Sequence, residues 1–260
     1  MFKVKVRKVV RRGRSHDQRC EDDSLIFSYN QIAVIAVFDG CSDGTDSYFA
    51  SGLFAKILKK IAIRNREYFE KINQDSNLED VVHNITRLFF DELKHTIAYY
   101  ELDNKEALST IVLSAVNLIT KQSFSIIIGD GSVYVDGDIY TVQPEKNEPQ
   151  YIAYSIKRDF EDFWGKSVNK YTFTIKDTIA VMSDGIDSFK KYNENRYVNE
   201  IEKADIVYRF FKSRLFLSNK IGLARICNIL ETEERIAPND DLSIAHITFV
   251  EIPEQSETIQ

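Results

Sequence analysis

The chain has 260 residues, of which 43% are hydrophobic and 28% are charged, as in an ordinary globular protein. Its formal net charge of −6 argues against a nucleic-acid-binding protein, because affinity for a duplex depends on neutralising phosphates. No apolar run reaches the roughly 20 residues that cross a bilayer, and the first residues lack a signal-peptide core. Cys20, Cys41 and Cys227 have neither disulfide-framework nor zinc-finger spacing. We therefore expect a cytoplasmic protein that binds neither nucleic acid nor membranes.

The first elements show clear periodicities. Residues 3–7 alternate basic and apolar side chains, which is typical of an edge strand protected by lysine. Residues 32–38 are apolar almost throughout, which predicts a strand that is covered on both faces. Helical spacing of apolar residues follows over residues 46–65 and again over residues 78–100.

The rest of the chain predicts more strands than helices. A strand meander is expected over residues 111–116, 124–128, 133–135 and 139–142, with Asp136-Gly137 as a hairpin turn. Further strands are expected over residues 171–175, 179–182 and 242–250, and helices over residues 204–217 and 220–230. The polar residues 192–203 are interpreted as an ordinary surface connection, in preference to a flap that faces a substrate.

Glycine and proline are sparse, and no flexible linker divides the chain. We therefore expect a single domain over residues 1–252, followed by a short tail of residues 253–260. Runs of strands interrupted by paired helices predict an α+β fold in which helices pack outside the sheets.

Three strand-like runs end at an acidic residue next to glycine, at Asp39-Gly40, Asp130-Gly131 and Asp184-Gly185. Asp240 lies just before the last strand, whose start lies beside the ends of the others if the sheet is antiparallel. Carboxylates that meet at one edge repel one another, so either some stay protonated or divalent cations lie between them. We expect a metal site, formed by Glu21, Asp22, Asp39, Asp130, Asp184 and Asp240.

Ligands that are all oxygen favour Mg²⁺ or Mn²⁺, and the four scattered histidines argue against zinc and copper. The backbone of Gly40 can approach an ion closely, because glycine has no side chain. A calcium loop beginning at Asp39 is the nearest alternative. It fails because its third place is Cys41, its twelfth place is Ala50 where glutamate is needed, and a strand precedes it.

In their order along the chain, these motifs resemble the metal-dependent serine/threonine protein phosphatases of the type 2C family. The resemblance rests on Glu21-Asp22, Asp39-Gly40, Ser109-Thr110, Gly129-Asp130-Gly131, Ser183-Asp184-Gly185 and Asp240-Asp241-Leu242-Ser243. A bacterial branch of the family is closer still, on Ser15-His16, Cys20-Glu21-Asp22, Asp39-Gly40-Cys41-Ser42 and Asn147-Glu148-Pro149-Gln150-Tyr151.

The resemblance implies a central sandwich of two packed antiparallel β-sheets, flanked by α-helices on both sides. It also implies hydrolysis of phosphoserine or phosphothreonine on a protein, by water activated by two Mg²⁺ or Mn²⁺ ions. In the family's pattern Asp39 bridges both ions, and Asp22 orders metal-bound water, so that these two residues are catalytic. The remaining ligands are Asp184 and Asp240 for one ion, Glu21 and the Gly40 carbonyl for the other, and Asp130 for a weaker third ion.

Two positions depart from that pattern. The arginine that grips the substrate phosphate in better-known members is replaced by Asp17, so Arg14, His16 and Arg19 are the candidates for that role. Cys41 replaces the family's frequent histidine and is a poorer proton donor to a leaving alkoxide. Two alternatives therefore stay open: a weak or inactive phosphatase-like module that binds a phosphoprotein, and a phosphatase that acts on small phosphate esters.

Overall fold

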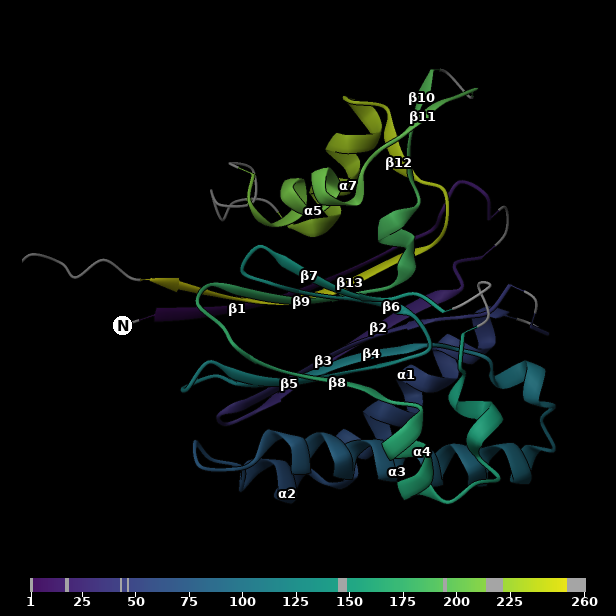
Figure 1. Cartoon of the computed structure of the whole chain (residues 1–260), viewed down its shortest axis with the longest axis vertical. Coiled ribbons are helices and arrows are strands. Elements are labelled where there is room, and N and C mark those ends of the chain that lie inside the picture. Colours follow the sequence, from purple (N-terminus) through teal and green to yellow (C-terminus); the bar gives the residue numbers. More distant parts are fainter. Residues whose placement is uncertain are drawn as a thin grey trace, which may run out of the picture.

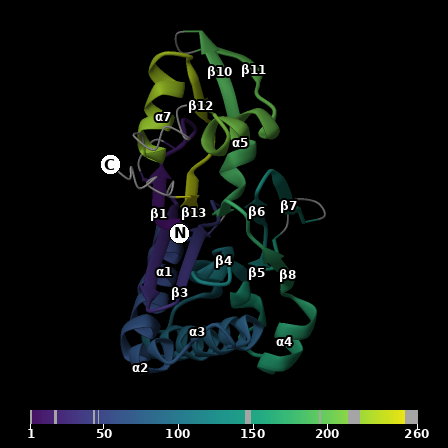
Figure 2. The same ribbon diagram turned by 90° about the vertical axis from the view of Figure 1, so that its left-hand side faces the viewer.

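The computed structural model describes residues 2–16, 19–42, 44–45, 47–144, 149–193, 196–213 and 222–251. Within them, two five-stranded antiparallel sheets stack face to face, with helices on both outer faces (Figures 1 and 2). This arrangement confirms the predicted α+β sandwich. The predicted tail of residues 253–260 lies outside the described residues, and the single domain over residues 1–252 stays a prediction.

The first sheet has the strand order β1-β13-β9-β6-β7. Its strands are β1 (Phe2–Arg11), β13 (Leu242–Glu251), β9 (Thr178–Met182), β6 (Gly131–Val135) and β7 (Asp138–Val142). Strand β1 lies at the edge, as its alternating lysines predict. Asp136 and Gly137 have φ values of 55° and 133° and join β6 to β7, so the predicted hairpin turn is confirmed.

The second sheet has the strand order β2-β3-β4-β5-β8. Its strands are β2 (Asp22–Tyr29), β3 (Ile32–Asp39), β4 (Ile111–Asn117), β5 (Gln122–Ile128) and β8 (Asn169–Thr174). Every residue of β3 from Ile32 to Phe38 is buried, which confirms that this strand is covered on both faces. Strand β2 was not predicted, and it runs beside β3 with Asp22 opposite Asp39.

Helices cover the outer face of each sheet. Against the second sheet lie α1 (Ser47–Arg64), α2 (Arg66–Glu70), α3 (Leu78–Tyr100) and α4 (Phe160–Lys166). Against the first sheet lie α5 (Lys203–Phe211) and α7 (Leu223–Thr232). Helix α3 has the predicted bounds because the Asn77 side chain accepts from Glu79 N at 3.0 Å and caps it. The predicted helix ends within residues 214–221 lie outside the described residues.

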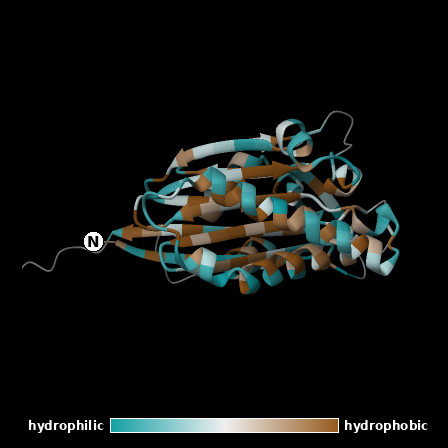
Figure 3. Ribbon diagram, turned by 90° about the horizontal axis from the view of Figure 1, so that it is seen from below, coloured by the Kyte–Doolittle hydropathy of each residue, from teal (hydrophilic) through white to brown (hydrophobic). Residues whose placement is uncertain are grey.

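Three layers of apolar packing follow from this arrangement. Residues of the two sheets that face each other, such as Ile35, Val112, Val181 and Ala245, form the central layer. The other two layers lie between each sheet and its helices. Figure 3 shows the hydrophobic residues concentrated on the strands, while the helices alternate apolar and polar residues as amphipathic helices do.

A small third sheet corrects the prediction for residues 192–203. Strands β10 (Phe189–Asn193), β11 (Arg196–Glu200) and β12 (Ile236–Pro238) pair in the order β11-β10-β12, and α5 begins at Lys203. The connection expected there is instead a strand pair at the periphery of the molecule (Figure 1). Strand β10 of this pair is held in place by pairing with residues 236–238, a long-range contact that the local sequence pattern does not show.

Candidate active site

One end of the sandwich brings together four acidic residues, Asp39, Asp130, Asp184 and Asp240. In the first sheet Met182 pairs with both Ile244 and Ser132, so the end of β9 lies beside the starts of β13 and β6. The residues next to those three points are Asp184, Asp240 and Asp130. In the second sheet Asp22 pairs with Asp39, and the backbone N–H of Thr110 donates to the Asp39 carbonyl at 2.8 Å.

Four of these acidic residues, all except Asp22, line a pocket of about 190 Å³. The lining consists of Asp39, Gly40, Cys41, Ser42, Thr110, Asp130, Pro149, Tyr151, Asp184 and Asp240. It therefore holds four carboxylates and no lysine or arginine among the described residues. Such a pocket has a strong negative potential that attracts cations.

Burial and crowding raise the pKa values of three carboxyl groups in the pocket. Removal from water raises the pKa of Asp39, and the neighbouring charges of Asp22 and Asp184 raise it further. Burial raises the pKa of Asp130 to about 7, with the charge of Asp184 as the next cause. The pKa of Asp240 is raised by burial and then by Asp184. Without a cation, Asp39, Asp130 and Asp240 therefore hold their protons to higher pH than free carboxyl groups do.

Asp22 contributes a buried oxygen that lacks a donor. Its Oδ2 accepts a hydrogen bond from Ser183 Oγ at 2.7 Å, and Ser183 Oγ in turn accepts from Ser243 N at 2.9 Å. Its Oδ1 is buried without a hydrogen-bond partner among the described residues. Burial raises the pKa of Asp22 as well. Because buried acceptors normally have a partner, this oxygen marks a place for water or a cation.

The donors present fit Mg²⁺ or Mn²⁺, since the pocket is lined by four carboxylates without a basic residue in its described lining, and the buried Oδ1 of Asp22, which pairs with Asp39, has no hydrogen-bond partner among the described residues. Within the residues that the structure describes, no three His, Cys, Asp or Glu side chains are close enough together to hold one ion by themselves. Mg²⁺ does not need such a cage, because it usually keeps several waters and takes one or two carboxylates.

Glu21 lies beside this pocket and not in its lining. Its carbonyl accepts from Gly40 N at 3.0 Å, and its carboxylate Oε2 accepts from Ser42 Oγ at 2.8 Å. The backbone of Glu21 is thereby fixed to Gly40, which does line the pocket. The two residues expected to serve one ion are therefore adjacent, with the Glu21 side chain held by a pocket residue.

Asp241 is a structural residue of the site that the sequence reasoning missed. It is only 1% exposed, its Oδ1 accepts from Gly13 N at 2.6 Å, and its Oδ2 accepts from Glu21 N. Gly13 is required there, because a Cβ on it would lie 2.2 Å from the carbonyl carbon of Asp240. Asp241 thus fastens the N-terminal loop to the start of β13. The adjacent acidic residues at positions 240 and 241 were the sequence signal that could have indicated this role of Asp241.

The three candidates for the substrate phosphate lie outside the acidic pocket lining. His16 Nδ1 is 2.8 Å from Asp241 Oδ2, and its Nε2 is 3.5 Å from Asp240 Oδ1. Burial lowers the pKa of His16, but these carboxylates raise it overall. The guanidinium of Arg19 lies 4.0 Å from the ring centre of Tyr48, and that of Arg14 lies 4.4 Å from the ring centre of Tyr192. Asp17, Asn147 and Glu148 lie outside the described residues.

Tyr151 and Cys41 lie next to each other in the pocket. Both line it, and burial together with Cys41 raises the pKa of Tyr151. Tyr151 was expected only as part of a motif, because nothing in the local sequence places it beside Cys41, which lies far earlier in the chain. None of the helices in the described part of the chain is long and apolar enough to span a bilayer.

The family model of protein phosphatase 2C matches residues 11–216, so the chain belongs to the protein phosphatase 2C family. No curated protein matches the sequence. A bacterial serine phosphatase shares 14% identity with it at a TM-score of 0.63, over 97% of this chain and 100% of that one. RsbX in complex with magnesium shares 12% identity at a TM-score of 0.53, over 96% and 100%.

The phosphatase domain of SpoIIE from Bacillus subtilis, solved with a fragment of its regulatory domain, gives a similar result. It shares 15% identity at a TM-score of 0.52, over 97% of this chain and 65% of that one. At these identities the solved structures support the fold alone. They agree with the predicted resemblance to a bacterial branch of the family.

Proposed function

We propose that the protein is a metal-dependent phosphatase that hydrolyses phosphoserine or phosphothreonine on a protein inside a bacterial cytoplasm. The observation that carries this proposal is the pocket where four carboxylates face one another without a basic residue in its described lining. A purely structural pocket has no use for such repulsion, whereas a site for divalent cations requires it. Membership of the phosphatase family gives the reaction class.

The proposed site residues keep the roles that the family pattern implies. Asp39 pairs with Asp22 across two strands and lines the same pocket as Asp184, and it would be a ligand of both ions. The further proposed ligands are Glu21, Asp22, the Gly40 carbonyl, Asp130, Asp184 and Asp240. When bound, Mg²⁺ or Mn²⁺ supplies an attacking water whose pKa is lowered towards neutrality.

The chain's own groups would then move the protons. Asp22 is the proposed residue that orders the attacking water, and its Oδ1, which has no hydrogen-bond partner among the described residues, would accept that water's proton. Ser183 holds Asp22 in place through Oδ2. Cys41, which stands where a proton donor is frequent, leaves protonation of the leaving alkoxide to solvent. Arg14, His16 and Arg19 stay the proposed candidates for holding the substrate phosphate.

The experiment is a titration of hydrolysis with Mn²⁺ and Mg²⁺ after the protein has been stripped with EDTA. We expect no hydrolysis of p-nitrophenyl phosphate without metal and saturable recovery with metal. Phosphoserine and phosphothreonine peptides should be cleaved, and a phosphotyrosine peptide of the same sequence should not. Undiminished hydrolysis in EDTA would contradict the proposal.

The alternative of a phosphoprotein-binding module is favoured by one specific observation, the cysteine at position 41 within the pocket. It predicts that a phosphopeptide binds without being cleaved under any metal. Failure of hydrolysis together with phosphopeptide binding would therefore select the module.

A further inference from the structure

One lysine of the helical layer contacts the acidic end of the first sheet. Lys203 is the first residue of α5, and its Nζ lies 2.8 Å from Ser132 Oγ on β6 and 2.9 Å from Thr141 Oγ1 on β7. The same Nζ lies 2.9 Å from both carboxylate oxygens of Asp187. An ammonium group has three hydrogens to donate, so these three side chains satisfy it. Lys203 thereby joins α5 to two strands and to the loop that contains Asp187.

The contacts of Lys203 flank two of the proposed metal ligands. Ser132 follows Asp130 by two residues in the chain. Asp187 is the last residue of the single-turn 3₁₀-helix η4 (Asp184–Asp187), which begins at the proposed ligand Asp184. One ammonium group therefore bridges the segment that carries Asp130 and the segment that carries Asp184.

The two segments that Lys203 joins carry charges that repel each other. Burial is the largest cause of the raised pKa of Asp130, the charge of Asp184 follows, and Asp187 makes a smaller contribution in the same direction. The ammonium group of Lys203 lies against Asp187 and offsets its charge. A fixed cation at this place opposes the repulsion that would move the two segments apart before a metal ion binds.

The position of Lys203 in α5 indicates that contacts across the fold account for this residue. It is the first residue of the helix, where a cation is unfavourable because the amino end of a helix carries partial positive charge. The Lys203 side chain is nevertheless only 19% exposed, and its hydrogen bonds within the described residues go to Ser132, Thr141 and Asp187. The stability of α5 by itself therefore does not explain this lysine.

We propose that Lys203 is a positioning residue of the metal site, which sets the spacing of Asp130 and Asp184 before an ion binds. It acts through Ser132 and Asp187, and it does not itself line the acidic pocket. A site whose ligands are held in place binds an ion with a smaller loss of conformational entropy. The proposal rests on the proposed function and adds a residue of the helical layer to the site.

Isothermal titration calorimetry with Mn²⁺ measures the effect of this positioning on affinity. Lys203→Met keeps a long apolar side chain and removes the ammonium group. We expect the folded variant to bind Mn²⁺ about tenfold more weakly, as is typical when a residue that supports metal ligands is removed. The sign is informative, because the loss of a nearby positive charge by itself strengthens the binding of a cation. Unchanged or tighter binding in folded Lys203→Met would overturn the proposal.

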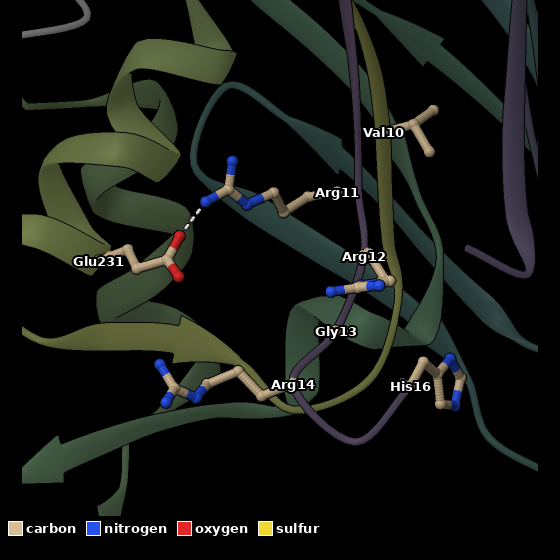
Figure 4. Close-up of a pocket in the computed structure, with 7 residues that line it drawn as sticks. All are labelled: Val10, Arg11, Arg12, Gly13, Arg14, His16 and Glu231. Carbon is tan, nitrogen blue, oxygen red and sulfur yellow. Dashed lines mark hydrogen bonds and ion pairs between the residues drawn. The ribbon is translucent and has the colours of Figure 1, made fainter. Parts of the chain in front are cut away.

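Arg11→Met is the matched control, because it removes the same charge and also breaks an ion pair between a helix and the first sheet. Figure 4 shows the Arg11 guanidinium extending from β1 towards Glu231 on α7, with which it pairs. Arg11 also donates to Asn228, and neither partner belongs to the segments that follow Asp130 and Asp184. We expect this variant, folded by circular dichroism, to keep the wild-type affinity for Mn²⁺. An equal loss in both variants would show that any loosening of the helical layer weakens binding, and it would refute the positioning role.

Hydrogen–deuterium exchange in EDTA tests the positioning without metal. The amides of residues 131–133 and 183–188 should exchange faster in Lys203→Met than in the wild type, because the ammonium group no longer joins these segments, while those of β3 should be unaffected. Unchanged exchange in both segments would overturn the proposal. If the wild type binds no Mn²⁺ and exchange in the two segments still depends on Lys203, this lysine holds the segments together as proposed and the proposed metal-dependent function fails.

Discussion

Asp130 gives the sharpest prediction, because its raised pKa makes the metal-free protein less stable as the pH rises. Its side chain is 6% exposed, and burial, followed by the charge of Asp184, raises its pKa to about 7 from a usual value of 3.8. Between these values the folded state holds a proton that the unfolded state has lost. The stabilisation is therefore complete below about pH 4 and is lost as the pH rises through about 7.

The magnitude follows from the two pKa values. Between pH 5 and pH 8 the unfolded carboxyl is ionised throughout, while the folded one loses its proton near pH 7. Over about two pH units the folded state therefore holds one proton more than the unfolded state. This corresponds to a loss of about 3 kcal/mol in the free energy of unfolding. Asp130→Asn cannot ionise, so its unfolding free energy should rise relative to the wild type by about this amount from pH 5 to pH 8.

The assay is urea unfolding in EDTA, followed by circular dichroism, at several pH values from 5 to 8. Asp91→Asn is the matched control, because Asp91 is exposed on α3 and does not line the pocket, and it should show no such pH-dependent gain. Addition of Mn²⁺ at pH 8 should stabilise the wild type more than Asp130→Asn. A difference between Asp130→Asn and wild type that stays constant or shrinks towards pH 8 would refute the reasoning.

Two further predictions concern the framework of the site. Ser183→Ala removes the acceptor of the buried Ser243 N–H, and it should lower the free energy of unfolding by about 1–3 kcal/mol in urea titrations; no loss would show that water replaces the hydroxyl. Gly13→Ala places a Cβ against the Asp240 backbone, and it should lower the melting temperature and weaken Mn²⁺ binding measured by calorimetry. Gly52→Ala in α1, where a Cβ meets nothing within 4 Å, should instead be neutral or stabilising, and equal effects of the two glycine variants would contradict this account.

The parts of the fold that local pattern determines were predictable from the sequence. Helix α3 has an apolar stripe and an Asn77 cap, and β3 is apolar without interruption, so both were located correctly. The meeting of Asp130, Asp184 and Asp240 at one end followed from topology, because in an antiparallel sheet the end of β9, just before Asp184, lies beside the starts of β6 and β13, just after Asp130 and Asp240.

The parts that depend on distant partners were not predictable. Strand β2 mixes polar and apolar residues and is a strand because it pairs with β3. The three short strands β10, β11 and β12 are ordered by pairing between residues 189–191 and 236–238. The role of Asp241 likewise depends on Gly13, more than two hundred residues away in the chain.

The central claim is that converging carboxylates bind the divalent cations that drive hydrolysis. It is tested most directly by measuring Mn²⁺ binding by calorimetry and p-nitrophenyl phosphate hydrolysis in parallel, in the wild type, Asp39→Asn and Asp91→Asn. We expect Asp39→Asn to stay folded, to bind Mn²⁺ much more weakly and to lose hydrolysis, while Asp91→Asn matches the wild type. Wild-type binding and hydrolysis in a folded Asp39→Asn protein would contradict the account.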